Sequence, residues 1–540
     1  MNEKLDLHDA GSGASPKALW LTAIIVFSLY LGVATHVLTQ GHLNEDAYIL
    51  FQYVQNVAAG NGIVFDSLSG PAEGATDFLW MIMLSGLAWI KIPPGVGAAI
   101  INGLGLALIA VTLVQVRGRL DMIATAAIAL VALSQTALAS ISGFSAFAYG
   151  GVFSLLLYAA LTQKPVAAVM LGLLLALLRP DGTLLAGGTI LAMLLFSDSG
   201  TRRSILVACI PATLVGLGYF AWRASYFGLW LPLPLIVKSS GVDAMQSITT
   251  NWRAIDSYIY LLVVALLATL YKKVKMPAGS RLVVALAGAS LLLLALSSAH
   301  QSQNIGYRFQ FPAVIALVFV LVILMNQFER NHRNLQIAMT VLCVGIALSS
   351  ARSAVVKGDE LVSPNYMNSF PLILREQGFE LQTIAITEAG RFPYWYDAPR
   401  MIDIVGLNSP SVVIEGPGKE LEEHSPSFVF AYHGRVYRTD ELPKEEQYVV
   451  LDAKDIRVNP YDGDNPVILA ALAALEYAQK SNFRAVLVKS EQSDQDFRHA
   501  FFLSRKTDIE RFLSILEKSF TSTRGYLASE KIRAALQKRY

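Results

Sequence analysis

Charge is scarce in this chain of 540 residues, because charged side chains make up 16% of it and hydrophobic ones 54%. Soluble domains carry about 25% charged residues, so an ordinary soluble protein is excluded. The formal net charge is only +2, without the basic excess that holds a nucleic-acid backbone. The composition therefore predicts a membrane protein and gives no reason to expect a nucleic-acid partner.

Cysteine and histidine are also sparse. The two cysteines, Cys209 and Cys343, lie in apolar runs, where they are typical of small core residues rather than of a disulfide or a metal site. The histidines His42, His300 and His424 show no metal-ligand spacing, so a transition-metal site is not expected. The chain has no Walker loop and no paired CxxC motifs, and its glycine-rich turn lacks the context of a nucleotide-binding fingerprint.

Long apolar runs dominate the first two thirds of the chain. They cover residues 18–37, 77–92, 96–116, 121–140, 147–162, 166–178, 183–197, 204–222, 255–271, 282–299, 309–326 and 335–350. Run 18–37 is too long for a signal peptide and predicts a retained anchor. Run 77–92 is short, opens at a candidate Thr76 cap and carries two tryptophans, so we expect it to lie in the membrane interface. About eleven spans remain.

The charges of the loops predict the topology, because short cytoplasmic loops are enriched in Lys and Arg. If every run from residue 96 onward spans the membrane once, the basic loops all fall on one side. These loops are residues 117–121, 162–164, 199–203, 271–275 and 329–333. Residues 1–17 are then a cytoplasmic tail and 18–350 a transmembrane module. The periplasmic side carries the loops 39–95, 223–254 and 300–308, and the C-terminal domain.

The sequence changes character at residue 351, where charge rises. Short β-like runs alternate with helical patterns, the strands at 383–387, 400–405, 447–451 and 484–488 and the helices at 466–480 and 494–519. Residues 351–540, about 190 in number, are enough for a core of their own. They predict a soluble α/β domain.

The first long loop begins with an acidic pair in the sequence EDAYILFQYVQNVAAG. Asn44 can cap a helix over 45–59, which places Glu45 and Asp46 in its first turn, where the helix dipole favours negative charge. The helix has one apolar face, so we expect it to lie in the membrane interface. Taken alone, such a pair is more often a solvated helix start than a catalytic site.

Ionisable and polar side chains recur in segments that the topology places on the same face as this pair. They are Arg179 and Asp181, Arg223 and Lys238, and Asn304, Tyr307 and Arg308. Run 166–178 covers only about 20 Å of a roughly 30 Å hydrocarbon core, so the break at Pro180 falls within the membrane. Ionisable residues at this depth are functional hypotheses, with snorkelling at a helix end as the alternative for each arginine.

This arrangement predicts an outward-facing cavity with one acidic pair and several cations. Arg and Lys would bind a lipid-linked phosphate, and a carboxylate would remove a proton from an attacking hydroxyl. These are the requirements of sugar transfer from a polyprenyl-phosphate donor.

The same residues resemble a known family, the bacterial GT-C glycosyltransferases related to the terminal arabinofuranosyltransferases. The first-loop sequence from EDAYILF to AEGATDFLW carries the resemblance, and LLRPDGTLL, WRASYFGLWLPLPLIVK, YRFQFP and EAGRFPYWYDAPRMIDIVGLNSP continue it in the expected order. It implies a polytopic α-helical membrane protein of about 11 transmembrane helices, with juxtamembrane helices in the first periplasmic loop and a C-terminal periplasmic α/β domain. The implied location is the bacterial inner membrane.

The resemblance also implies an activity and its residues. The reaction would move a monosaccharide, arabinofuranose in the family resembled, from a polyprenyl-phosphate donor to a glycan or glycolipid acceptor of the cell envelope. Asp46 would be the base, with Glu45 and Tyr48 beside it. The basic positions Arg179, Arg223, Lys238 and Arg308 would hold the donor phosphate, with Asp181, Asn304 and Tyr307 as further site candidates. Participation of a divalent cation such as Mg²⁺ or Mn²⁺ is left open.

The chain departs from the family pattern at two places. Gln52 stands where family members often have Arg, and GFSA at 143–146 stands where they have Gly-Leu-Glu-Thr. In this chain, the contacts that the Arg and Glu side chains make in the family must be missing or made by other residues.

Two alternatives are left open. A transporter or flippase of lipid-linked glycans would also need a cationic cavity, but it should show internal repeats, and none is evident. The aromatic group Phe392, Tyr394, Trp395 and Tyr396 would either stack on acceptor sugar rings or dock the soluble domain onto the membrane module.

Overall fold

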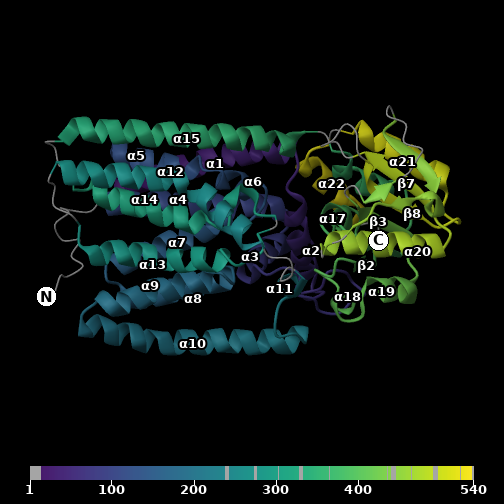
Figure 1. The fold of residues 1–540 in the computed structure, drawn as a ribbon, viewed down its shortest axis with the longest axis horizontal. Coiled ribbons are helices and arrows are strands. Elements are labelled where there is room, and N and C mark those ends of the chain that lie inside the picture. The colour runs from purple at the N-terminus through teal and green to yellow at the C-terminus, as the bar shows by residue number, and fades with distance from the viewer. Residues whose placement is uncertain are drawn as a thin grey trace.

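The molecule is elongated, with a bundle of helices at one end and a sheet domain at the other (Figure 1). The computed structural model describes residues 14–237, 243–272, 277–301, 303–327, 332–363, 365–433, 436–438, 446–461, 463, 465–489, 497–522 and 524–537. Within these residues the predicted fold class is confirmed: a polytopic helical module followed by a sheet domain.

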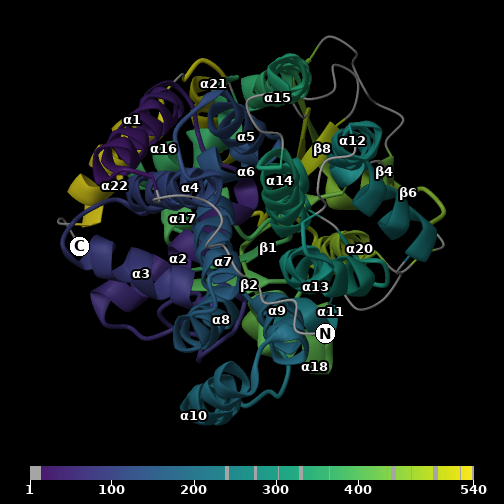
Figure 2. The same cartoon turned by 90° about the vertical axis from the view of Figure 1, so that its left-hand side faces the viewer.

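Six helices of the described chain are long and apolar enough to cross a membrane. They are α1 (Pro16–Gln40), α4 (Pro94–Arg117), α10 (Ser199–Phe227), α12 (Ala244–Tyr271), α13 (Gly279–Leu296) and α15 (Arg333–Val362). Seen from the bundle end, α10 lies at the periphery (Figure 2), and only 11% of its apolar window is buried against protein. Such exposure of apolar side chains is what a lipid-facing helix requires.

The remaining predicted spans are shorter apolar helices. They are α5 (Met122–Ala132), α6 (Thr136–Ile141), α7 (Ala146–Leu161), α8 (Pro165–Leu178), α9 (Gly182–Phe196) and α14 (Phe311–Met325). Every residue of α14 is buried, so this helix forms the centre of the bundle. The single span predicted at 121–140 is divided into α5 and α6 by a turn at residues 133–135, and the Thr136 hydroxyl donates to the Gly306 carbonyl (2.8 Å) in the loop before α14.

The loops at the domain end contain short helices. They are α2 (Glu45–Ala59), α3 (Phe78–Trp89), α11 (Leu233–Val237) and η1 (Ile305–Tyr307). The predicted helix at 45–59 is confirmed, and Asn44 caps it by accepting the Asp46 N–H at 3.1 Å. The predicted Thr76 cap of α3 is wrong, because Asp77 is the residue before the helix and its carboxylate is engaged elsewhere.

The last bundle helix, α15, continues to Val362, so the boundary expected at residue 351 lies inside it. The domain that follows has helical segments around one main sheet. The helical segments are η3 (Tyr366–Asn368), α16 (Phe370–Glu376), α17 (Arg391–Tyr396), α18 (Pro410–Glu415), α19 (Pro417–His424), η4 (Ala453–Asp455), α20 (Pro466–Lys480), α21 (Ile509–Phe520) and α22 (Tyr526–Gln537).

The main sheet has the order β2-β1-β3-β8-β7-β5, with β1 parallel to both of its neighbours and the other pairs antiparallel. Its strands are β1 (Thr383–Ile386), β2 (Arg400–Asp403), β3 (Phe428–Tyr432), β5 (Tyr448–Asp452), β7 (Arg484–Lys489) and β8 (Phe497–Leu503), and β4 (Tyr437–Arg438) pairs with β6 (Arg457–Val458). The helix predicted at 494–519 is therefore wrong in its first half. Residues 497–503 form a buried strand between β3 and β7, and only α21 is helical.

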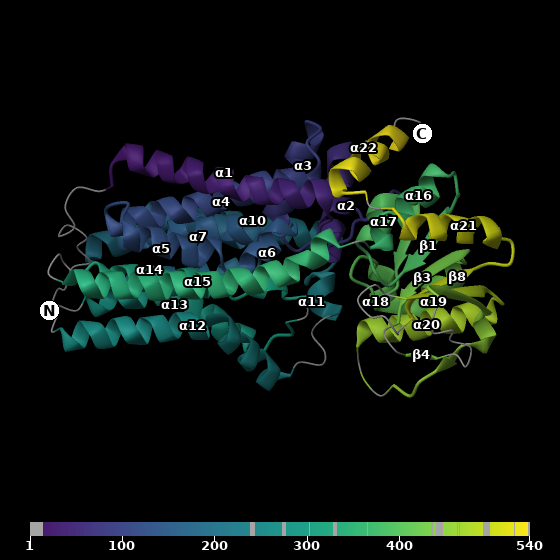
Figure 3. The same cartoon turned by 90° about the horizontal axis from the view of Figure 1, so that it is seen from above.

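The first long loop, residues 41–93, lies between the bundle and the domain (Figure 3). Glu45 Oε1 accepts the backbone N–H groups of Gly390 (2.8 Å) and Arg391 (2.9 Å), and Arg391 donates to the Leu43 carbonyl (3.2 Å). Further along the loop, the Tyr53 hydroxyl donates to Asn408 (3.0 Å). The domain is thus fastened to α2 through buried polar contacts.

The C-terminal helix α22 also joins the two parts. The Tyr526 hydroxyl accepts the Gly95 N–H at 3.0 Å, and the Tyr526 N–H donates to the Gly41 carbonyl at 2.8 Å. The end of the chain therefore packs against the ends of α1 and α4.

Gly390→Ala tests this junction. A Cβ at Gly390 would lie 2.0 Å from the Glu45 carbonyl oxygen, so α2 and α17 would have to separate. We expect a loss of about 1–3 kcal/mol, measured as a lower thermal midpoint in detergent. Gly418→Ala is the control, because nothing lies within 4 Å of the Cβ it adds. Equal midpoints for the two variants would contradict the junction.

Candidate functional site

Five segments distant in the sequence meet near the start of α2. They are the break between α8 and α9, the residues before α3 and α7, the loop that ends in Arg308, and the turn after β1. The turn after β1 lies at the carboxyl end of a parallel strand, the edge where open α/β sheets bind ligands.

The two carboxylates of the acidic pair have different environments. Glu45 is occupied by the N–H groups of Gly390 and Arg391, and its second oxygen lies 3.6 Å from the Arg391 side chain. Burial raises the pKa of Glu45, and Arg391 opposes the shift. The Asp46 carboxylate is half-buried and makes no hydrogen bond or ion pair with any residue that the structure describes. Asp46 is therefore the member of the pair available for chemistry.

Arg308 is a half-buried cation with a buried Nη1 atom, and its charge interacts with that of Asp46. Its guanidinium lies 3.6 Å from the centroid of the Phe144 ring, and its Nη1 has no hydrogen-bond partner in the described structure. Burial lowers the pKa of Arg308 to about 10, and among the surrounding charges Asp46 opposes this shift most strongly. An arginine buried with an unpaired nitrogen is unfavourable unless an anion completes its contacts.

Arg179 is already paired. It donates two hydrogen bonds to Asp181, at 3.1 and 2.8 Å, and its guanidinium lies 4.7 Å from the Tyr149 ring centroid. The predicted residues Arg179 and Asp181 are thus brought together, but as an ion pair that cancels their charges.

Asp77 is a site residue that the sequence reasoning missed. Ser145 donates to its carboxylate at 2.7 Å, and burial raises the pKa of Asp77 against the attraction of Arg179 and Arg308. Ser145 and Phe144 belong to the GFSA segment that departs from the family pattern. The only sequence signal for Asp77 was its own position as an acidic residue in the first long loop, because the residues that contact Asp77 lie far away in the sequence.

Arg223 lies in a separate group. It forms an ion pair with Glu73 at 2.5 Å and donates to the Trp230 carbonyl at 2.8 Å. Glu73 is a further partner that the sequence did not predict. Lys238, the fourth cation predicted to bind phosphate, lies outside the described residues.

The other predicted site residues have structural contacts. Tyr48 is fully buried, with its ring centroid 5.1 Å from that of Tyr394 and 5.5 Å from that of Trp395. Asn304 donates to Gln310 at 2.9 Å within the loop before α14. Tyr307 lies in the same loop, with Lys357 6.0 Å from its ring centroid.

The aromatic group of the domain is buried. Tyr394 and Trp395 pack on Tyr48, and Phe392 stacks on Phe428, which supports domain docking and core packing rather than exposed sugar stacking. Gln52, the other departure from the family pattern, donates weakly to Asp397 at 3.4 Å.

Glu388, in the turn after β1, is a second residue that the sequence reasoning did not assign to the site. Its carboxylate lies 3.9 Å from His499, and burial together with Glu45 and Asp46 raises the pKa of Glu388 to about 8, against the attraction of Arg391. The domain therefore adds a third carboxylate to the acidic pair.

Within the described residues, no group of three or more His, Cys, Asp or Glu side chains is placed to hold a metal ion. The participation of a divalent cation stays a prediction.

The fold is of the GT-C type, a multi-pass membrane protein with a C-terminal sheet domain. The solved structures similar to it include ArnT from Cupriavidus metallidurans bound to undecaprenyl phosphate, with a TM-score of 0.58 and 11% identity over 89% of this chain and 97% of that chain. The apo form of ArnT gives a TM-score of 0.56 and 12% identity over 77% of this chain and 93% of that chain. At this identity the likeness shows the fold.

No family model matches the chain, and no curated protein does.

Glu388→Gln tests the environment of this carboxylate. The pKa of about 8 exceeds the ordinary value of 4.5, so the folded protein keeps a proton that the unfolded chain releases between these values. The stability from this proton is present at low pH and is lost as the pH rises through the folded pKa. We therefore expect the difference in thermal midpoint, variant minus wild type, to increase as the pH rises from about 5 to about 9.

Glu423→Gln, which changes an exposed carboxylate of α19, is the control. A difference between Glu388→Gln and wild type that stays constant with pH would contradict the raised pKa.

Proposed function

We propose that this protein is an inverting glycosyltransferase that takes a monosaccharide from a polyprenyl-phosphate donor. The observation that carries the proposal is an unengaged carboxylate, Asp46, within electrostatic reach of an arginine, Arg308, whose buried Nη1 lacks a partner among the described residues. A carboxylate can accept a proton and an arginine can bind a phosphate, and sugar transfer from a phosphate donor needs both.

The charge balance favours Arg308 as the principal phosphate ligand. Asp181 neutralises Arg179 and Glu73 neutralises Arg223, both at ion-pair distance. Arg308 is close to acidic groups but makes no ion pair with any of the described residues. An incoming phosphate therefore gains most at Arg308. The ArnT structure of the same fold holds undecaprenyl phosphate, which supports a ligand of this class.

The proposed reaction is a single displacement. Asp46 accepts the proton of the acceptor hydroxyl as that oxygen attacks the anomeric carbon of the donor sugar. The bond between the anomeric carbon and the phosphate oxygen breaks, and its electron pair leaves with the polyprenyl phosphate. Arg308 stabilises the negative charge that develops on the departing phosphate. One displacement inverts the anomeric centre.

Finer assignments extend this proposal. The resemblance of the first long loop favours arabinofuranose as the sugar and a glycan or glycolipid of the cell envelope as the acceptor. The basic loops at the end of the bundle away from the domain favour a periplasmic position for the domain and the site. Activity that is lost in a chelator and restored by Mg²⁺ or Mn²⁺ would establish a divalent cation.

A transporter of lipid-linked glycans is the rival from another class. It would use the same cation to bind phosphate, but it has no need for an unengaged carboxylate beside it. Translocation of a lipid-linked glycan in liposomes by protein that transfers no sugar would favour the rival.

Asp46→Asn tests the base. A general base contributes about 10² to 10⁴-fold to the rate, so we expect kcat to fall on that scale. The thermal midpoint should stay close to that of the wild type, because the carboxylate has no partner among the described residues. Asp359→Asn, at an exposed position of α15, is the matched control. An Asp46→Asn enzyme with full activity would rule out this role.

Arg308→Gln tests the phosphate ligand by two effects of opposite sign. Removing a buried charge without an ion-pair partner should maintain or raise the thermal midpoint of the free protein. The rise in midpoint that polyprenyl phosphate gives the wild type by binding the folded state should be lost. Arg203→Gln, which changes an exposed arginine, is the control. Polyprenyl phosphate should still raise the thermal midpoint of this control. An unchanged response to polyprenyl phosphate would exclude Arg308.

A further inference from the structure

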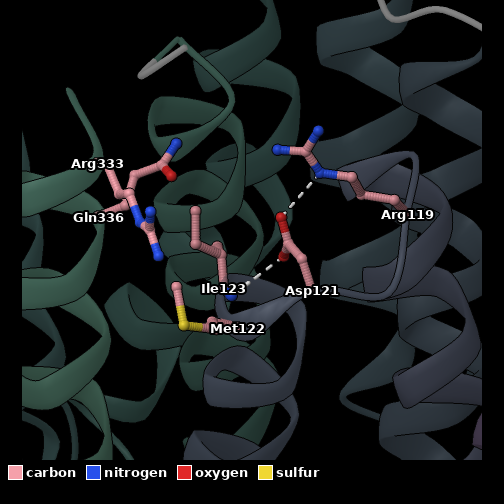
Figure 4. A pocket seen from close by; sticks show the side chains of 6 residues that line it. All are labelled: Arg119, Asp121, Met122, Ile123, Arg333 and Gln336. Atoms are coloured by element: carbon pink, nitrogen blue, oxygen red, sulfur yellow. Dashed lines mark hydrogen bonds and ion pairs between the residues drawn. The ribbon is translucent and has the colours of Figure 1, made fainter. Parts of the chain in front are cut away.

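A cavity lies at the end of the bundle away from the sheet domain, and the proposed reaction does not use it. The pocket has a volume of about 430 Å³ and is formed by the loop after α4, the first turn of α5 and the first turn of α15. Figure 4 shows Arg119 on one side and Arg333 with Gln336 on the other, and its lining is Arg119, Asp121, Met122, Ile123, Arg333 and Gln336.

The pocket has an excess of positive charge. Asp121 Oδ2 accepts from Arg119 (2.9 Å) and also from Arg117 (3.0 Å), while its other oxygen caps α5 by accepting the Ile123 N–H (3.0 Å). One carboxylate thus serves two guanidinium groups. Arg333, on the opposite wall, makes no ion pair with any described side chain, so the described charges at the pocket, three arginines and Asp121, sum to two positive charges.

The floor of the pocket is apolar. Met122 and Ile123 form it, and Met122 is 51% exposed. Ile123 also lines a small apolar void of about 10 Å³ between α5, α14 and α15, beside Met339 and Cys343. Apolar side chains of α5 thus form one wall of the cationic pocket.

We propose that this pocket binds the phosphate headgroup of an anionic phospholipid. Basic pockets between transmembrane helices bind anionic headgroups, and Arg forms strong charge-assisted bonds to phosphate oxygens. An alternative is that these arginines only set the orientation in the membrane, which requires basic residues at this end of the bundle. It would not require two arginines on opposite walls of a cavity with an apolar floor.

The test measures lipid retention by the full chain in detergent with equal amounts of dioleoylphosphatidylglycerol and dioleoylphosphatidylcholine. Native mass spectrometry counts the lipids that stay bound. We expect the wild type to retain phosphatidylglycerol preferentially. Arg119→Gln combined with Arg333→Gln should lower this preference by between about fivefold and 25-fold, since a cation near a membrane surface contributes about fivefold.

Arg202→Gln combined with Arg203→Gln is the matched control, because it removes two exposed arginines from the start of α10 at the same end of the bundle. The control should keep the preference. If both double variants lost the preference for phosphatidylglycerol equally, general surface charge would explain it and the proposed lipid site would be overturned. Displacement of the lipid by inorganic phosphate alone would show an anion site without lipid specificity, and would also overturn the proposal.

If the double variant does not fold, Arg119→Gln alone decides the question, because the Arg119 side chain is 59% exposed. A preference unchanged in that variant would contradict the proposal. Lipid binding is measured without sugar transfer, so its failure would leave the proposed function untouched.

Discussion

The contact of Glu45 with the backbone of Gly390 and Arg391 is the constraint on which the rest of the structure depends. It fixes the start of α2 against the domain, and the next residue, Asp46, is thereby held with its carboxylate unengaged. Two adjacent acidic residues thus divide two tasks. Glu45 joins the membrane module to the domain, and Asp46 stays available for a proton.

This junction makes the candidate site a property of the whole chain. The bundle supplies Arg179, Asp181 and Arg308, the first long loop supplies Asp46 and Asp77, and the domain supplies Glu388. Burial, together with the nearby charges of Glu45 and Asp46, raises the pKa of Glu388. The domain is therefore part of the electrostatics of the site, whatever further role it has towards an acceptor.

Local signals predicted much of this arrangement. Asn44 and the pattern of residues after it gave the position of α2, and the shortness of run 166–178 located the break that carries Arg179 and Asp181. Long apolar runs gave the fold class. Where prediction failed, contacts distant in the sequence are present: Thr136 donates to Gly306 next to the break in a predicted span, and pairing with β3 and β7 makes 497–503 a strand rather than a helix.

The site was predictable in its residue types but not in its charge balance. No local pattern shows that Glu73 neutralises Arg223, because the two residues are 150 apart in the sequence. For the same reason Asp77 and Glu388 were not recognised as members of the site. Arg179 and Asp181 are neighbours in the sequence, but only the structure shows that they pair while Arg308 does not.

The central claim is sugar transfer from a polyprenyl-phosphate donor. The most direct measurement gives the purified wild-type protein a panel of radiolabelled polyprenyl-phosphate sugars, with a cell-envelope extract as acceptor, and follows the label. The account predicts that label moves to the acceptor from one donor and that polyprenyl phosphate is released. Protein that binds polyprenyl phosphate but moves label from none of the donors would contradict it.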